Sequence, residues 1–308
     1  MISRMVIAVS IIILLAGSGA TSPPAVAQSG SADHLPPPIQ LVRAAVANEV
    51  VAANDSSIKH MFRDYKKSAQ GSQTRIYVET QEAIAGMTIA YNDKPLTPQQ
   101  FQGEEGRLAG LVNNPQQLEH KRRQEKEEAD HTLSIVKALP DAFLFAYDGS
   151  ETGTANLGRE GQPLVRLKLQ PNPAYRPPSH VEDVLVGMSG TILIDPEARR
   201  LARIDGTLFK EVTFGWGILG HLDRGGHFFV EQQGLADGSW AIARMSLNFA
   251  GRVLLFRTIA ISSDEVFSNF QRVPADTSFA QGVQMLKAER ARLVESGAET
   301  AKADNSSH

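Results

Sequence analysis

The chain has 308 residues, of which 42% are hydrophobic and 21% charged, proportions that are ordinary for a globular protein. A formal net charge of −3 argues against general nucleic-acid binding, which leaves a basic footprint on a sequence. The chain contains no cysteine, which excludes disulfides, thiolate metal sites and a lipid anchor on an N-terminal cysteine.

Residues 1–27 have the layout of a cleavable secretory signal peptide. Arg4 supplies a positive charge, residues 5–17 form an apolar stretch, and residues 25–27 form a small-x-small site that predicts cleavage at Ala27-Gln28. The apolar stretch is shorter than the roughly 20 residues that span a bilayer, so a signal is favoured over a retained anchor. We therefore expect the mature protein in the periplasm or secreted, without a stable membrane anchor.

The next segments predict one helix and a group of strands. Residues 28–38 are polar and proline-rich, and we expect a disordered leader there. Apolar residues at helical spacings predict a helix over residues 39–53. Short apolar runs separated by Gly71 and Gly86 predict strands between residues 58 and 91.

Residues 97–138 predict a charged pair of helices. Thr97 is the expected N-cap of the first helix, Gln100 closes a capping box, and Asn114 caps the second helix. Residues 119–128 contain no strong apolar side chain. Spaced opposite charges favour a solvated helix here, although a charged docking surface is the alternative.

A long antiparallel meander is predicted for the C-terminal half. Alternating apolar residues and turn signals favour consecutive hairpins over a parallel sheet. Hairpin turns are expected at Asp237-Gly238 and Ala250-Gly251. The predicted strands are residues 141–148, 165–169, 184–194, 202–208, 211–216, 227–233, 240–249 and 253–261, with loops at 149–162 and 171–179.

The meander is followed by a short element at residues 266–270, a terminal helix at 279–294 and a polar tail at 296–308, which we expect to be disordered. An antiparallel sheet that does not pack on a second sheet must cover its inner face with helices or hold a ligand. The sequence thus predicts an α+β protein, with a curved antiparallel sheet forming an unclosed half-barrel and helices, including 279–294, covering its concave face. We expect one domain over residues 39–295.

Few residues suggest catalysis or metal binding. His221, Asp223, His227 and Glu231 are residue types that bind zinc, but their spacing matches no established ligand pattern. A hairpin turn at residues 224–226 with polar flanks is the favoured interpretation. We predict no metal, no cofactor and no enzymatic activity, and a metal-dependent hydrolase is a remote alternative.

Three glycine-containing segments partly match the patterns of functional sites. Residues 187–190 lack the last glycine of a nucleophile elbow, so Ser189 is expected to be an ordinary strand serine. Gly149, Gly153 and Gly158 form a loop without the Lys-Ser/Thr of a phosphate cradle. Glycines around Trp216 favour a strand end with positive φ, with close ligand approach as the alternative.

Residues 190–209 (GTILIDPEARRLARIDGTLF) and 228–256 (FFVEQQGLADGSWAIARMSLNFAGRVLLF) carry a resemblance to a known clan. The segment is similar to the periplasmic carriers of outer-membrane lipoproteins, the Lol-type carrier and receptor proteins and their sensor relatives. The resemblance implies an unclosed half-barrel whose helices plug the concave face over an apolar cavity for acyl chains. No functional residue of the clan matches a position here, so none is carried over.

The leading functional hypothesis is an exported periplasmic protein that binds a hydrophobic ligand, a lipid or lipoprotein acyl chains, as carrier or sensor. The alternative is a non-enzymatic interaction module that binds an envelope protein through its charged helix pair. The same strand residues form a closed core if no cavity is present. The candidate cavity residues are Val186, Met188, Ile192, Ile204, Trp216, Trp240, Ile242 and Leu254.

Overall fold

The computed structural model describes residues 36–214, 220–253 and 257–297. The predicted signal peptide, most of the leader and tail, Trp216 and Leu254 lie outside these residues. The strands are β1 (Lys59–Ser68), β2 (Gly71–Val78), β3 (Ala85–Tyr91), β4 (Lys94–Pro95), β5 (Phe143–Thr152), β6 (Pro163–Pro171), β7 (Met188–Asp195), β8 (Arg200–Leu208), β9 (Val212–Phe214), β10 (Gly220–Leu222), β11 (His227–Gly234), β12 (Trp240–Val253) and β13 (Arg257–Val273). The helices are α2 (Pro38–Asn54), α3 (Pro98–Asn113), α4 (Pro115–Ala142) and α5 (Phe279–Ser296), with a 3₁₀ turn, η1, at Asp183–Gly187.

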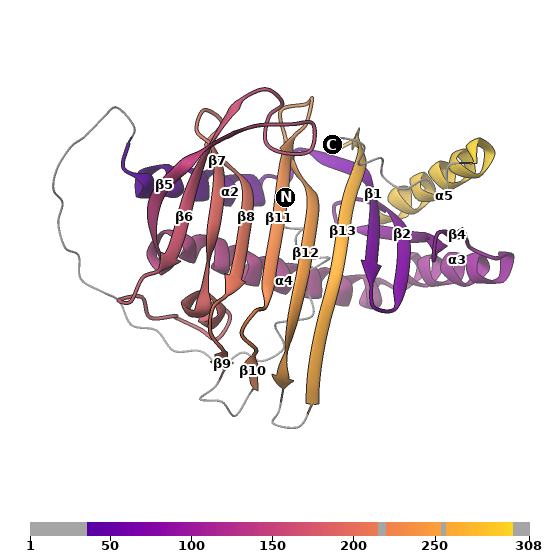
Figure 1. The fold of residues 1–308 in the computed structure, drawn as a ribbon. Coiled ribbons are helices and arrows are strands. Elements are labelled where there is room, and N and C mark those ends of the chain that lie inside the picture. The colour runs from indigo at the N-terminus through magenta and orange to yellow at the C-terminus, as the bar shows by residue number, and fades with distance from the viewer. Residues whose placement is uncertain (1–35, 215–219, 254–256, 298–308) are drawn as a thin grey trace.

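The strands form one unclosed 13-stranded sheet, in the order β4-β3-β2-β1-β13-β12-β11-β8-β7-β6-β5, with β9 and β10 beside this path (Figure 1). The named strand pairs run antiparallel. The predicted α+β class with a curved antiparallel sheet is therefore confirmed. β1 joins the end of the meander through β13, which places the N-terminal strands beside the C-terminal ones.

α2 and α4 lie across one face of the sheet, the concave face (Figure 1). Val46 of α2 and Leu139 of α4 are buried in one cluster with strand residues such as Ile192. A buried ion pair also holds α2 to the sheet, because Arg200 Nε donates to Glu49 Oε1 at 2.8 Å. These contacts fill the space between the helices and the β5–β8 part of the sheet.

α5 packs on the opposite face, so the expectation that residues 279–294 cover the concave face is wrong. Val283 and Leu286 of α5 are buried against Ile76 and Met87. Successive strand residues point to opposite faces. Tyr77, next to Ile76, belongs instead to the cluster that continues onto the concave face.

The predicted helix pair and its caps are confirmed. The backbone N–H of Gln100 donates to Thr97 Oγ1 at 3.3 Å, and the Gln100 side chain accepts from the Thr97 N–H at 2.9 Å. Asn114 Oδ1 accepts from the N–H groups of Gln116 and Gln117 at 3.1 Å each. Each cap satisfies amides that the first helical turn leaves without intrahelical partners.

Two strand boundaries differ from the expected ones near residue 141. α4 continues through Pro140 to Ala142, so the strand predicted from residue 141 begins at Phe143. β5 then extends to Thr152, into the predicted loop, through a bulge in its pairing between Tyr147 and Ser150. Gly149 permits this bulge, because its φ of 105° is disfavoured for other residues.

The predicted strand from residue 184 begins later, at Met188, because residues 183–187 form η1. The apolar alternation there belongs to a 3₁₀ turn that buries Leu185. Alternation over three or four residues is too short to distinguish the two structures.

Two of the predicted hairpin turns are wrong, whereas Asp237-Gly238 does connect β11 to β12. β12 runs through Ala250-Gly251 to Val253, and Gly251 allows β10 to approach, since an added Cβ would lie 2.1 Å from the His221 carbonyl oxygen. Residues 224–226 join β10 and β11, which do not pair with each other but both pair with β12. The predicted short element at 266–270 is likewise part of the long β13.

Candidate functional site

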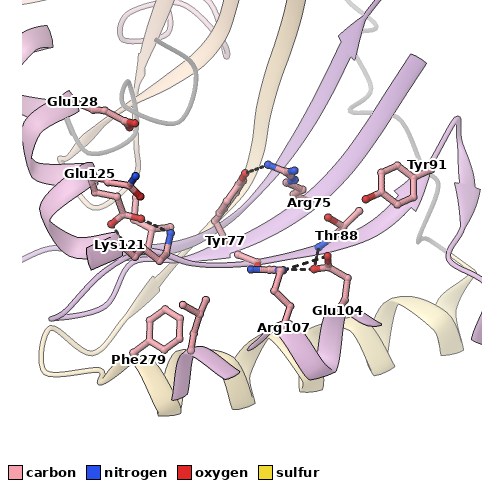
Figure 2. Close-up of a pocket in the computed structure, with 14 residues that line it drawn as sticks. Arg75, Tyr77, Thr88, Tyr91, Glu104, Arg107, Lys121, Glu125, Glu128 and Phe279 are labelled. Carbon is pink, nitrogen blue, oxygen red and sulfur yellow. Dashed lines mark hydrogen bonds and ion pairs between the residues drawn. The ribbon is translucent and has the colours of Figure 1, made fainter. Parts of the chain in front are cut away.

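A pocket of about 420 Å³ lies where β2 and β3 face α3, α4 and the start of α5 (Figure 2). We call it the polar pocket. Its walls combine charged, phenolic and hydroxyl groups with a few apolar side chains. The residues that line it include Arg75, Tyr77, Ile84, Arg107, Lys121, Glu125 and Glu128.

The pocket is built on the outer edge of β3. β4 pairs only with the last two residues of β3, which leaves the backbone groups before them without a neighbouring strand. Side chains from α3 and α4 replace that strand. Glu104 accepts from the Thr88 N–H at 3.2 Å, Arg107 donates to the Gly86 carbonyl at 2.6 Å, and Glu125 accepts from the Ile84 N–H at 3.0 Å. The charged helix pair therefore satisfies an edge that would otherwise be free to pair with another chain.

Burial governs the ionisation of the pocket groups. It raises the pKa of the Tyr77 phenol well above its ordinary value, so this group remains neutral and able to donate a hydrogen bond. Burial also raises the pKa of the Glu125 carboxyl, an effect that the Lys121 ammonium 2.6 Å away opposes. Arg75 donates to the Tyr77 hydroxyl at 3.2 Å.

A buried apolar cluster adjoins the pocket on the concave face. We call it the strand cluster, and its buried members are Phe62, Tyr77, Ile84, Val230, Ile242, Met245 and Phe267. None of these seven belongs to a helix in the part of the chain that the structure describes. Phe62 stacks on Tyr77 with ring centroids 5.4 Å apart. Tyr77 and Ile84 also line the polar pocket, so they form a wall between the pocket and the strand cluster.

The structure separates the predicted cavity residues that it describes. Ile242 belongs to the strand cluster, and Ile204 packs against both this cluster and the one beneath α2 and α4. Met188 and Ile192 are buried beneath those helices.

The remaining candidates lie elsewhere. Trp240 packs in another cluster, with Leu164 and Leu193 beneath the β5–β6 loop. Val186 is half-buried in η1, and Trp216 and Leu254 lie outside the described residues. No single surface thus contains all of the predicted residues, and ligand contact by any of them stays a prediction.

The four residues weighed as metal ligands do not converge. His227 Nε2 lies 2.8 Å from Asp205, and Glu231 pairs with Arg203 at 2.8 Å. His221 and Asp223 instead lie near Glu211, with potential ligand atoms within 4.8 Å of one another. Two of these three residues are exposed, and groups of exposed acidic residues are common without a metal, so we assign no site to them.

The sequence interpretation missed the polar pocket. Arg75 and Tyr77 alternate with Ile76, which is a readable sign of a strand face bearing polar groups. The predicted solvated helix is correct for residues such as Arg122 and Lys126, which are exposed, whereas Lys121 and Glu125 face the pocket. The sequence does not separate the pocket-facing charges from the exposed ones, because charged residues occur on all sides of this helix. Charge spacing alone therefore does not show which residues contact the sheet edge.

The fold and the pocket define a class: an α+β protein with an unclosed antiparallel sheet and a polar pocket beside a buried apolar cluster. None of its described helices is long and apolar enough to cross a membrane. No protein-family model matches the chain, and no curated protein matches it. The crystal structure of a DUF1329 family protein from Desulfovibrio piger aligns over 77% of this chain and 93% of that one, at 8% identity and a TM-score of 0.24. Similarity at this level supports no functional statement, and the resemblance to Lol-type carriers stays a prediction.

Proposed function

We propose that this chain is an exported, non-enzymatic protein that binds an amphiphilic ligand, a lipid or lipoprotein acyl chains, as a carrier or sensor. The observation that carries the proposal is the wall shared by the polar pocket and the strand cluster, made by Tyr77 and Ile84. Charged ligand groups need polar partners when they leave water, and apolar chains gain free energy on burial. A ligand with both kinds of group fits a polar pocket that has Tyr77 and Ile84 in its wall.

Export is part of the proposal and is supported by the signal-peptide layout of residues 1–27. A periplasmic or secreted location gives such a protein access to lipids and lipoproteins of the envelope. Cleavage would release it from the membrane, as a shuttle or sensor requires.

Mass spectrometry of the purified mature protein tests the proposal. We expect acyl chains to co-purify and to be released by organic extraction. Ile84→Ser should weaken binding of the re-added lipid about tenfold, since it removes a buried apolar contact. Leu144→Ser, at an exposed position on β5, is the matched control and should bind normally. A properly folded protein that carries no acyl chain and takes up none would overturn the proposal.

A second candidate is an envelope interaction module that uses the outer surface of α4. The Glu119–Arg122 and Lys126–Asp130 pairs are exposed there, away from the pocket. Exposed pairs of this kind contribute little to stability, so a neutralised surface should still fold. Loss of a defined envelope partner from a pull-down when Arg122 and Lys126 are both changed to Gln would favour this function.

A further inference from the structure

Most charges in the polar pocket are already compensated within the protein. Glu104 pairs with Arg107 at 2.8 Å, and Glu125 pairs with Lys121 at 2.6 Å. Each pair also bonds to the backbone of the β3 edge, which fixes its position. These four groups therefore cancel in charge and are occupied in structural roles.

Arg75 is the cation of the pocket lining that takes part in neither of these two ion pairs. Its guanidinium donates to the neutral Tyr77 hydroxyl, and within the described residues it makes no ion pair at 4.0 Å or less. Asp64 lies opposite Arg75 in the pairing of β1 with β2. Burial raises the pKa of the Asp64 carboxyl well above its ordinary value, and the nearby Glu265 raises it further, whereas the charges of Arg75 and Lys66 oppose this rise. Because Arg75 lines the pocket and no described carboxylate lies within 4.0 Å of it, an anion in the pocket could pair with its guanidinium.

Glu128 is the corresponding anion. It lies on α4, three residues after Glu125, and is half-buried in the pocket wall. It likewise makes no ion pair at 4.0 Å or less within the described residues. Figure 2 shows Glu128 on the helical wall and Arg75 on the strand wall, so the two charges belong to different sides of the pocket.

We propose that the polar pocket binds the headgroup of a zwitterionic amphiphile, with its phosphate or carboxylate at Arg75 and its ammonium group at Glu128. This inference rests on the proposed function, because it places the apolar chain of the same ligand against the pocket wall made by Tyr77 and Ile84. A volume of about 420 Å³ is in the range of small-molecule sites, and guanidinium groups recognise phosphates and carboxylates through paired N–H donors.

Calorimetric titration of the delipidated mature protein tests the headgroup assignment. The probes are dihexanoyl phosphatidylethanolamine, which is zwitterionic, dihexanoyl phosphatidylglycerol, which is anionic, and inorganic phosphate alone. We expect about tenfold tighter binding of the zwitterionic lipid, from one charge-assisted contact, and no measurable binding of phosphate. Glu128→Gln should abolish the preference by weakening only the zwitterionic lipid, and Arg75→Gln should weaken both lipids.

Glu127→Gln is the matched control, because Glu127 is exposed on the same helix outside the pocket. A loss of preference in this control equal to that in Glu128→Gln would overturn the inference, as would phosphate binding as tightly as lipid. If Arg75→Gln fails to fold, the headgroup preference of Glu128→Gln alone tests the inference. Binding of both lipids without headgroup preference contradicts the inference alone, whereas binding of neither lipid contradicts the proposed function as well.

Discussion

Individual polar residues fasten distant strands of this sheet together. His60 at the start of β1 is buried, and its Nε2 lies 2.9 Å from Asp237 in the β11–β12 turn. Ser239 Oγ donates to Asp237 at 2.6 Å and also lies 3.4 Å from the same imidazole nitrogen. In a catalytic serine site, the histidine nitrogen would accept the proton of the serine hydroxyl. Here His60 Nε2 faces the Asp237 carboxylate, so the arrangement suits a structural role, which we call the turn lock.

This lock predicts a pH dependence of stability. Burial alone would raise the pKa of Asp237, but hydrogen bonds from Ser239 and His60 outweigh it and lower the pKa to about 2. A carboxyl whose pKa is lower in the folded state stabilises the protein above its unfolded pKa, near 4, and loses this contribution as the pH falls toward 2. Asp237→Asn should therefore cost about 2 kcal/mol at pH 7 and progressively less below pH 4.

Urea denaturation of both proteins between pH 2.5 and 7 measures the difference in unfolding free energy. Asp264→Asn, at an exposed position 3.7 Å from Arg244, is the control and should show a small difference with little pH dependence. A cost for Asp237→Asn that stays constant down to pH 2.5 would contradict the lowered pKa.

Among the elements, α3 is a weak helix held in place by its surroundings. Three of its residues, Gly103, Gly106 and Gly110, are exposed glycines, which are unfavourable in a helix interior. Its N-terminal capping box and the contacts of Glu104 and Arg107 with the edge of β3 compensate for them. The helix thus depends on tertiary contacts more than on its own propensity.

Alanine substitution should stabilise α3. A Cβ at any of the three glycines meets nothing within 4 Å, so each Gly→Ala change should raise the unfolding free energy by about 0.5–1 kcal/mol. Gly251→Ala is the contrasting variant, because its Cβ would overlap the His221 carbonyl oxygen, and it should lower stability. Thermal unfolding checks both signs. A lower unfolding free energy of the α3 variants would contradict this prediction.

At the scale of the whole molecule, one sheet connects all of the hydrophobic clusters. β1 and β13 pair from Lys59↔Val273 to Ser68↔Ser263, although they lie at opposite ends of the folded chain. The cluster on α5 and the cluster beneath α2 and α4 lie on opposite faces and are linked by the strand cluster. Loss of either end of the sheet would expose the edge of its neighbour.

We therefore expect the mature protein to unfold in a single cooperative transition, because one continuous sheet joins the hydrophobic clusters of the predicted single domain over residues 39–295. The chain has two tryptophans, so a Trp216→Phe variant leaves Trp240 as a local fluorescent probe of β12. Its denaturation midpoint should coincide with that of the far-ultraviolet circular dichroism of the whole chain. Two separated transitions would divide the residues into independent units and contradict the prediction.

The sequence by itself determined the features that depend on interactions between residues close together in the chain. The caps at Thr97 and Asn114 could be predicted because their partners lie two or three residues away, and the α+β class followed from strand alternation and turn residues. Only the tertiary structure decided where the charged side chains act. Glu125 reaches the Ile84 amide across 41 residues, and such a contact depends on sheet register and helix placement, which no local pattern contains. For the same reason, alternation identified Ile192 and Ile242 as inward-facing candidates, but only packing assigned Ile192 to the core beneath α2 and α4 and Ile242 to the strand cluster beside the pocket.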